Sequence, residues 1–211
     1  MKVNWYKRFC LYLLTLLAFS SSGFSQSQFK RAGDFYALER HGDLLTGYVF
    51  SEVSAFSDGK AWVNKGELYG YIDTLGRPIT LFHFADVSAF QNGYAIVSKD
   101  TLGGNFGVIN HTGYEICKLT YTRIKHFSKG FAPIQHDTVW GLLDTLGREA
   151  ITPEFDVPPI VISTNFIIVS KKGRWGVIKI SGEVVYDLEF DLITKDGVAF
   201  KQNEKVYLGL L

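Results

Sequence analysis

The feature of this sequence that most restricts its fold is a unit of about 35 residues that recurs through most of the chain. An aromatic residue followed by glycine marks the unit, in the pairs Tyr69-Gly70, Phe106-Gly107, Trp140-Gly141 and Trp175-Gly176. Leu208-Gly209 reads as a truncated last copy and Phe35-Tyr36 as a degenerate first one. A period of this length is typical of arrays in which similar structural units stack on one another.

The half-repeat after each marker keeps two further positions in all five copies. A glycine follows the marker by six residues, at Gly42, Gly76, Gly113, Gly147 and Gly182. An aromatic residue follows it by fourteen, at Phe50, Phe84, Tyr121, Phe155 and Phe190. The glycine suits a type I turn closed by a left-handed residue, which is a common hairpin geometry.

The other half of the unit is also regular. A large apolar residue recurs at Phe56, Phe90, Phe127, Ile162 and Ile193. Three residues after it come Gly59, Gly93, Gly130, Asn165 and Asp196. Because glycine, asparagine and aspartate tolerate positive φ best, we expect one left-handed turn position in every copy.

Each unit reads as short strands separated by turn signals, and no helical period is present after residue 25. In the fourth copy we expect strands at 166–170, 174–179 and 184–192. The sequence therefore predicts an all-β fold of tandem repeats, arranged as an antiparallel meander, a curved β-repeat stack or a propeller-like ring. A ring would pair the C-terminal hairpin, residues 198–211, with the strand around Phe35 and so remove exposed strand edges.

Strand parity predicts which faces are covered. In the strand at 174–179, Trp175 and Val177 face one way, while Gly176 and Ile178 face the other, so both faces are apolar and we expect both to be buried. A glycine inside a strand indicates a bulge or a close approach by another group. We expect an aromatic ring from a neighbouring repeat to lie over it. Pro133 predicts an edge or a bulge in the third copy.

The tandem hairpins resemble bacterial WG repeats. The resemblance rests on Trp140-Gly141-Leu142-Leu143-Asp144, on Arg174-Trp175-Gly176-Val177-Ile178, and on the downstream Ile151-Thr152-Pro153-Glu154-Phe155-Asp156. It covers roughly residues 35–211. It implies a β-rich repeat architecture and, most often, no defined catalytic activity, and it supplies no functional residues to carry over.

The first 25 residues have the order of a secretory signal peptide. Lys2, Lys7 and Arg8 precede an apolar run at 9–19, and small polar residues follow at 20–25. Cleavage would leave 26–211 as a single repeat domain of about five copies plus the truncated one. That domain has 19 basic and 21 acidic residues, so its net charge of −2 disfavours nucleic acid as a partner. Cys117 would be its only cysteine, which excludes an internal disulfide.

No set of residues predicts an active site, a cofactor or a metal. His41, His83, His111, His126 and His136 lack metal-ligand spacing, and Cys117 has no base placed beside it by the pattern. Asp187, Glu189 and Asp191 share one face of the strand at 184–192, opposite Leu188, Phe190 and Leu192. Three such carboxylates could hold calcium or act as acid and base. Alternating charge on a solvated strand is also what protects a sheet edge from pairing.

The sequence therefore predicts a non-catalytic module of the periplasm, cell surface or exterior that binds a protein or a cell-surface glycan. It predicts no binding of nucleic acid and no stable membrane insertion after cleavage. The alternatives are a small secreted hydrolase or a carbohydrate-binding protein. Length varies between copies only in loops, which is where repeat proteins carry their binding residues.

Overall fold

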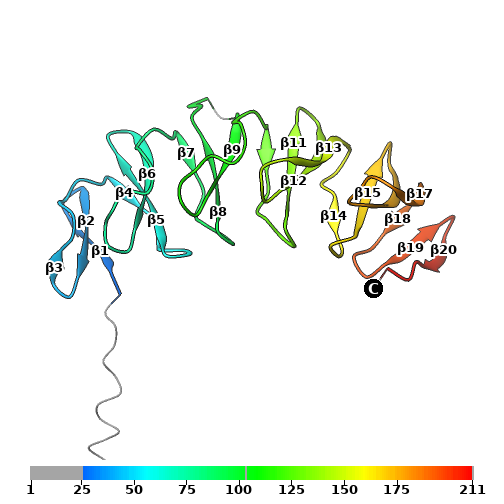
Figure 1. The fold of residues 1–211 in the computed structure, drawn as a ribbon, viewed down its shortest axis with the longest axis horizontal. Coiled ribbons are helices and arrows are strands. Elements are labelled where there is room, and N and C mark those ends of the chain that lie inside the picture. Colours follow the sequence, from blue (N-terminus) through cyan, green and yellow to red (C-terminus); the bar gives the residue numbers. More distant parts are fainter. Residues whose placement is uncertain (1–25, 103, 211) are drawn as a thin grey trace, which may run out of the picture.

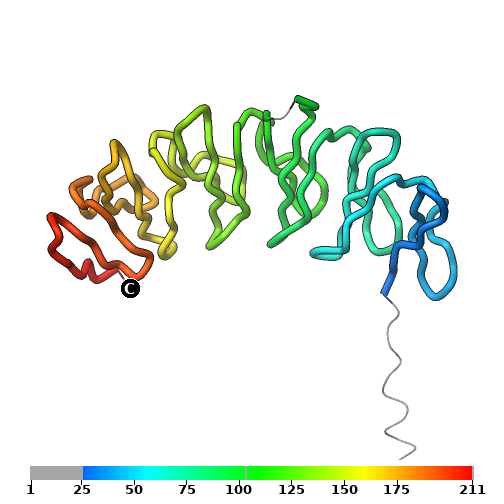
Figure 2. The backbone as a smooth tube through the Cα atoms, turned by 180° about the vertical axis from the view of Figure 1, so that it is seen from behind, coloured from blue at the N-terminus to red at the C-terminus, as the bar shows by residue number. Residues whose placement is uncertain are grey.

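The protein is an open, curved row of six small antiparallel sheets (Figure 1). The computed structural model describes residues 26–102 and 104–210, so the predicted signal peptide at 1–25 lies outside the described part. The view from behind shows the first and last sheets at opposite ends of the arc (Figure 2). The expected fold class is confirmed in its form of a curved stack, and the ring closed by residues 198–211 and the strand around Phe35 is wrong. Along the described residues, no helix has the length and apolar character to cross a bilayer.

Each sheet is a meander of strands that follow one another in the chain. The sheets of the N-terminal half are β1 (Gln28–Ala32), β2 (Phe35–Arg40) and β3 (Asp43–Leu44); β4 (Glu52–Val53), β5 (Lys60–Lys65) and β6 (Leu68–Asp73); and β7 (Asp86–Val87), β8 (Tyr94–Ser98) and β9 (Phe106–Asn110).

The two sheets that follow contain the Trp-Gly copies and have a fourth strand. The remaining strands are β10 (Arg123–Ile124), β11 (Phe131–His136), β12 (Val139–Asp144) and β13 (Glu149–Phe155); β14 (Ile160–Val161), β15 (Phe166–Lys171), β16 (Arg174–Lys179) and β17 (Val184–Phe190); and β18 (Leu192–Ile193), β19 (Val198–Lys201) and β20 (Glu204–Tyr207).

The marker aromatic and the aromatic fourteen residues after the glycine are partners across the sheet. The paired residues are Tyr69 with Phe84, Phe106 with Tyr121, Trp140 with Phe155 and Trp175 with Phe190. The second member of each pair is buried, with an exposed fraction between 1 and 7%. The two aromatic positions are therefore neighbours in space. The segment that follows the turn glycine runs back alongside the strand that carries the marker aromatic.

The first copy differs from the predicted register by one residue. Tyr36, and not Phe35, pairs with Phe50, and the Tyr36 N–H donates to the Phe50 carbonyl at 2.7 Å, as Tyr69 does to Phe84 at 2.8 Å. The buried Ala37 therefore occupies the place of the marker glycine. Counted from the paired aromatic residue, the first copy is one residue shorter than the others. The difference lies in the turn, where His41 and Gly42 form a two-residue hairpin between β2 and β3.

The turn glycines have the predicted left-handed backbone. Their φ values lie between +77° and +91° at Gly42, Gly76, Gly113, Gly147 and Gly182. In the last four copies the glycine N–H donates to the carbonyl three residues earlier, at 2.9–3.0 Å. This is the predicted type I turn closed by a left-handed residue.

The second expected turn is left-handed in three copies only. Gly59, Gly93 and Gly130 have positive φ, and so do the residues directly before them, which gives two-residue hairpins. The expectation is wrong at Asn165 and Asp196. In the fourth copy the Ser163 hydroxyl closes the loop by accepting from the Asn165 and Phe166 N–H groups. In the last copy the neighbouring Gly197 has φ +76° instead.

The marker glycines lie where the returning segment bulges over the strand. Between the pairs Trp140–Phe155 and Leu142–Ile151, β13 advances four residues while β12 advances two. The extra residues fold onto Gly141, where an added Cβ would lie 2.3 Å from the Ile151 carbonyl oxygen. The bulge is as predicted, but at Gly141 and Gly176 the covering group is the backbone of the same copy and not an aromatic ring of a neighbouring repeat. At Gly70 and Gly107 the nearest contacts are side chains of the same copy, the Phe82 ring and Leu119.

The core consists of separate clusters, each between two consecutive sheets. The residue directly after the marker glycine packs toward the next sheet, as Val177 does. The residue after that packs toward the preceding sheet, as Ile178 does. The same rule holds for Tyr71 and Ile72, Val108 and Ile109, and Leu142 and Leu143. The prediction that this strand is covered on both faces is confirmed, and each copy contacts mainly its two neighbours.

A repeated hydrogen bond joins successive copies. At the turn that follows the large apolar residue, a side chain donates to the backbone carbonyl of the equivalent apolar residue in the next copy. The pairs are Ser57 with Phe90 at 2.5 Å, Asn92 with Phe127 at 3.0 Å, and Lys129 with Ile162. Each bond satisfies a carbonyl at a junction between repeats, where burial without a partner would be costly.

Two further strand predictions need correction. In β17 the alternation is incomplete, because Phe190 is buried while Leu188 and Leu192 are 38 and 44% exposed, so no continuous apolar face runs along 184–192. Pro133 lies inside β11, between β10 and β12. It is tolerated because the equivalent Trp62 and Ile96 N–H groups bond only to serine hydroxyls, and copy three has Lys125 in place of that serine.

Candidate functional site

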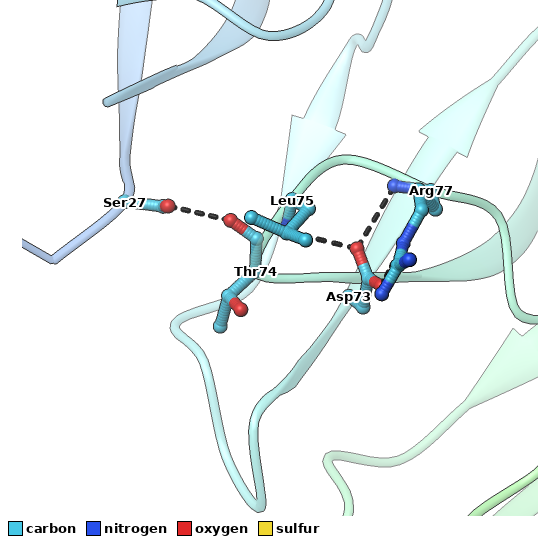
Figure 3. Close-up of polar contacts among 5 residues, drawn as sticks. All are labelled: Ser27, Asp73, Thr74, Leu75 and Arg77. Atoms are coloured by element: carbon cyan, nitrogen blue, oxygen red, sulfur yellow. Dashed lines mark hydrogen bonds and ion pairs between the residues drawn. The ribbon is translucent and has the colours of Figure 1, made fainter. Parts of the chain in front are cut away.

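The near-duplicated turns at 73–77 and 144–148 hold polar groups that stabilise the turn itself. Asp73 Oδ1 accepts from the Leu75 and Arg77 N–H groups at 2.9 Å, and Arg77 Nε donates to Asp73 Oδ2 at 2.7 Å (Figure 3). Ser27 Oγ also donates to the Thr74 carbonyl at 2.5 Å, which ties the N-terminal segment to this turn (Figure 3). Burial alone would raise the pKa of Asp73, but these hydrogen bonds and the Arg77 charge outweigh it and lower the pKa.

The turn at 144–148 repeats this arrangement with the same atoms. Asp144 accepts from the Leu146 and Arg148 N–H groups at 2.9 Å and from Arg148 Nε at 2.8 Å. In the fifth copy, which Trp175-Gly176 marks, the charges are exchanged, because Lys179 pairs with Glu183 at 2.8 Å. An ion pair that keeps its place while its signs reverse supports the hairpin.

Cys117 is half-buried against the cluster between the third and fourth sheets. Burial raises the pKa of its thiol to about 11, so the thiol is protonated at neutral pH. A thiol in that state is a poor nucleophile, and the position behaves as a small apolar packing residue.

The histidines and the strand carboxylates do not form a cluster. Within 26–102 and 104–210, no three histidine, cysteine or acidic side chains lie where they could hold a metal ion together. Glu189 pairs with Lys201 at 2.6 Å, and Asp191 pairs with Arg174. Two of the three predicted carboxylates are therefore held by separate cations rather than directed at one point.

One candidate binding feature is a cleft of about 520 Å³ between β13 and β17. Ala150, Thr152 and Glu154 line one wall, and Val184, Tyr186 and Leu188 line the other. The cleft opens because this junction lacks a contact that the earlier ones have. An added Cβ at Gly113 or Gly147 would clash with a carbonyl of the preceding copy, at 2.6 and 1.8 Å, whereas at Gly182 it would meet nothing within 4 Å.

A second cleft of about 590 Å³ spans the last three sheets and is basic. Its charged and titratable lining residues are Lys125, His126, Lys129 and Lys195, and no carboxylate lines it. Trp175, Pro158 and Pro159 add apolar lining to the cleft. The Lys125 ammonium lies 5.5 Å from the centre of the Trp140 ring, and Lys129 bonds to the Ile162 carbonyl, so two of the cations are held in place.

The repeat units match a known family description. The description "WG containing repeat" matches residues 40–69, 69–101, 106–137 and 140–175, which is more than half of the chain. The chain belongs to the WG-repeat family. The matched units meet at the marker aromatics Tyr69, Phe106, Trp140 and Trp175, the residues whose cross-strand pairs organise each sheet. The predicted resemblance to WG repeats is thereby confirmed over four units between residues 40 and 175.

Comparison with curated protein sequences gives no match. Among solved structures, Hsv2p of Kluyveromyces lactis is similar at 11% identity and a TM-score of 0.40, over 74% of this chain and 59% of that one. A crystal structure of a eukaryotic initiation factor is similar at 13% identity and a TM-score of 0.45, over 89% of this chain and 60% of that one. This WG-repeat chain thus spans about three fifths of the length of those chains.

The sixteen predicted repeat-defining residues lie in the scaffold and outside the two clefts, except Phe155, Trp175 and Gly182. The repeat pattern therefore identified the residues that hold the fold together, but it did not identify most of the residues that line the two clefts. A signal for the basic cleft was present in the departures from the repeat: Lys125 replaces the serine of two earlier copies, and Pro158-Pro159 interrupts the segment before the next unit.

Proposed function

We propose that this WG-repeat protein is a non-catalytic recognition module, which binds a macromolecular partner through surfaces formed by successive repeats. The observation that carries the proposal is that recurring and variable residues occupy different places in the structure. The residues that recur in every copy are mostly buried in the framework, while residues that change between copies line the two clefts at the junctions of the last repeats. A rigid framework with variable junctions and loops is how repeat proteins present binding surfaces.

The absence of catalytic activity is part of the proposal. The Cys117 thiol is protonated, and Glu189 and Asp191 are paired with different cations. The turn carboxylates Asp73 and Asp144 are engaged by the backbone of their own turns. These groups are used in holding the fold, which supports binding over chemistry.

We place the module outside the cytoplasm, in the periplasm, at the cell surface or in the exterior, because the signal-like order of residues 1–25 supports export. The partner is a protein or a glycan of that compartment. A near-neutral net charge supports the view that nucleic acid and anionic bilayers are not its targets.

Screening the purified protein against immobilised envelope proteins and glycans tests this function. Substitution of an exposed loop residue such as Leu102, which is 93% exposed, or of a cleft residue should weaken capture of the partner without lowering thermal stability. Surface changes of this kind usually alter stability by under about 0.5 kcal/mol. Turnover of a small molecule that is abolished by Asp187→Asn would overturn the proposal. So would unchanged capture after deletion of a whole repeat, since the repeats would then be spacers.

A further inference from the structure

We propose that the basic cleft between the third copy and the C-terminal hairpin binds a uronate-bearing glycan, with the sugar ring on Trp175 and the carboxylates on the surrounding lysines. This inference rests on the proposed recognition function and names one class of partner for one surface. It is carried by the charge of the cleft, by its apolar wall and by the prolines along it.

The charge of the cleft calls for an anionic occupant. Lys125, Lys129 and Lys195 line it together with His126, without a lining carboxylate, in a chain whose formal net charge is only +1. Elsewhere on the described surface, ion pairs neutralise five lysines locally, as Glu154 does for Lys171 at 2.5 Å. Clustered cations raise the local concentration of an anion and reward its binding, because their mutual repulsion is relieved.

The lysines come from separate elements and are partly fixed. Lys129 lies at the two-residue turn before β11, and its Nζ is bonded to the next copy at Ile162. Lys125 follows β10 and lies over the Trp140 ring. Lys195 comes from the loop between β18 and β19. Cations held in position lose less entropy on binding than free side chains, so the site is partly organised before the ligand arrives.

The wall of the cleft favours a sugar over a peptide. Trp175 is half-buried and lines the cleft, and the negative face of an aromatic ring attracts the weakly positive C–H edge of a pyranose. Three of the chain's five prolines, Pro133, Pro158 and Pro159, line the same cleft. Because proline has no N–H, this wall is a poor template for pairing with an extended peptide strand. A pyranose that carries a carboxylate offers an anion to the lysines and an apolar C–H face to the Trp175 ring.

Isothermal titration of the purified protein with trigalacturonate, at low and at high salt, tests the inference. We expect binding that weakens as salt rises, because exposed ion pairs are screened. Lys195→Gln and Lys125→Gln should each weaken binding about two- to fivefold, which lies within the range of exposed charge pairs. Lys118→Gln is the matched control, because Lys118 is exposed and lies outside the cleft, and it should leave binding unchanged.

A second measurement tests the stacking role of Trp175. The NMR signal of the Trp175 indole N–H should shift on addition of trigalacturonate, and neutral trigalactose should shift it far less. Trp175→Phe keeps an aromatic residue that Phe106 already provides at this position in another copy, so the fold should be retained while affinity falls.

Several results would overturn the inference. One is no binding of trigalacturonate, and another is wild-type affinity in both Lys195→Gln and Lys125→Gln. A third is binding of trigalactose, triglutamate or a short oligothymidylate with the affinity of trigalacturonate. If the protein still captures another partner in the envelope screen, the recognition function stands and only the uronate cleft is wrong. If it captures nothing there, both fail.

Discussion

The marker glycines give a graded test of how the repeat is built. At Gly141 an added Cβ would lie 2.3 Å from the Ile151 carbonyl oxygen and 2.7 Å from the Pro153 nitrogen, both of them backbone atoms. Ordinary contact begins near 3.4 Å, so Gly141→Ala must push β13 back by roughly 1 Å. Overpacking of this kind costs about 1–3 kcal/mol, which lowers the midpoint of thermal unfolding by roughly 2–12 °C in a chain of this size.

The other markers should respond less, in the order of their contacts. Gly176→Ala meets the Tyr186 carbonyl at 2.7 Å and should cost less than Gly141→Ala. Gly107→Ala meets the Leu119 side chain at 3.0 Å and backbone atoms only at 3.3 Å, so the loss should be smaller still. Ala37 at the equivalent place in the first copy already shows that the site accepts a Cβ where the third segment is arranged differently.

The matched control is Gly47→Ala. Gly47 does not have a left-handed φ, and its added Cβ would meet only Val49 Cγ1, at 3.5 Å. Loss of backbone freedom in the unfolded chain should leave stability unchanged or slightly raised. Thermal unfolding followed by circular dichroism provides all four midpoints. A loss for Gly141→Ala no greater than that for Gly107→Ala would refute the reasoning that backbone of the same copy covers the glycine.

Three further predictions follow from the turns, the thiol and the N-terminus. Asp144→Asn should keep the turn but remove the charge contact with Arg148. Because the pKa of Asp144 is lowered in the fold, the ionised carboxylate stabilises the folded state above the unfolded pKa near 4. This stabilisation is lost as the pH falls through the folded pKa. The difference in midpoint between wild type and Asp144→Asn should therefore shrink below about pH 4, and a constant difference from pH 7 to 2 would contradict the assignment. Cys117→Ser should leave partner binding intact and cost some stability, measured by parallel binding and unfolding curves, whereas loss of binding with an unchanged fold would revive thiol chemistry. Mass spectrometry of the protein from its native envelope should show a chain that begins at or near Gln26, and a retained Met1 would refute export by cleavage.

Much of the fold could be predicted because two positions in the repeat are fixed by backbone chemistry. Only a residue that tolerates positive φ fits the turn at Gly76 or Gly147, so glycine recurs and reveals the period. The pairing of Trp140 with Phe155 needs a large ring at both ends, so aromatic residues recur as well. The register of the first copy could not be predicted, because Phe35 and Tyr36 are both aromatic and the missing residue lies in the turn.

The contacts between successive repeats could not be predicted from the sequence, for a different reason. Ser57, Asn92 and Lys129 bond the next copy from equivalent turns, yet they share only the ability to donate a hydrogen bond. When a structural role is kept but the residue type changes, the sequence shows no repeated residue that would reveal it. The clefts are likewise set by what one copy lacks relative to another, such as the missing contact at Gly182, and that is visible only once the copies are placed side by side.

The central claim is that the repeats stack as an open arc, so that the clefts between the last copies stay accessible to a partner. Small-angle X-ray scattering from the purified, processed protein tests it most directly. The account predicts the scattering of an elongated, curved particle, with a distance distribution that has a long tail. A compact, symmetric distribution with the central hollow of a closed ring would contradict it, because the two end sheets would then have to meet.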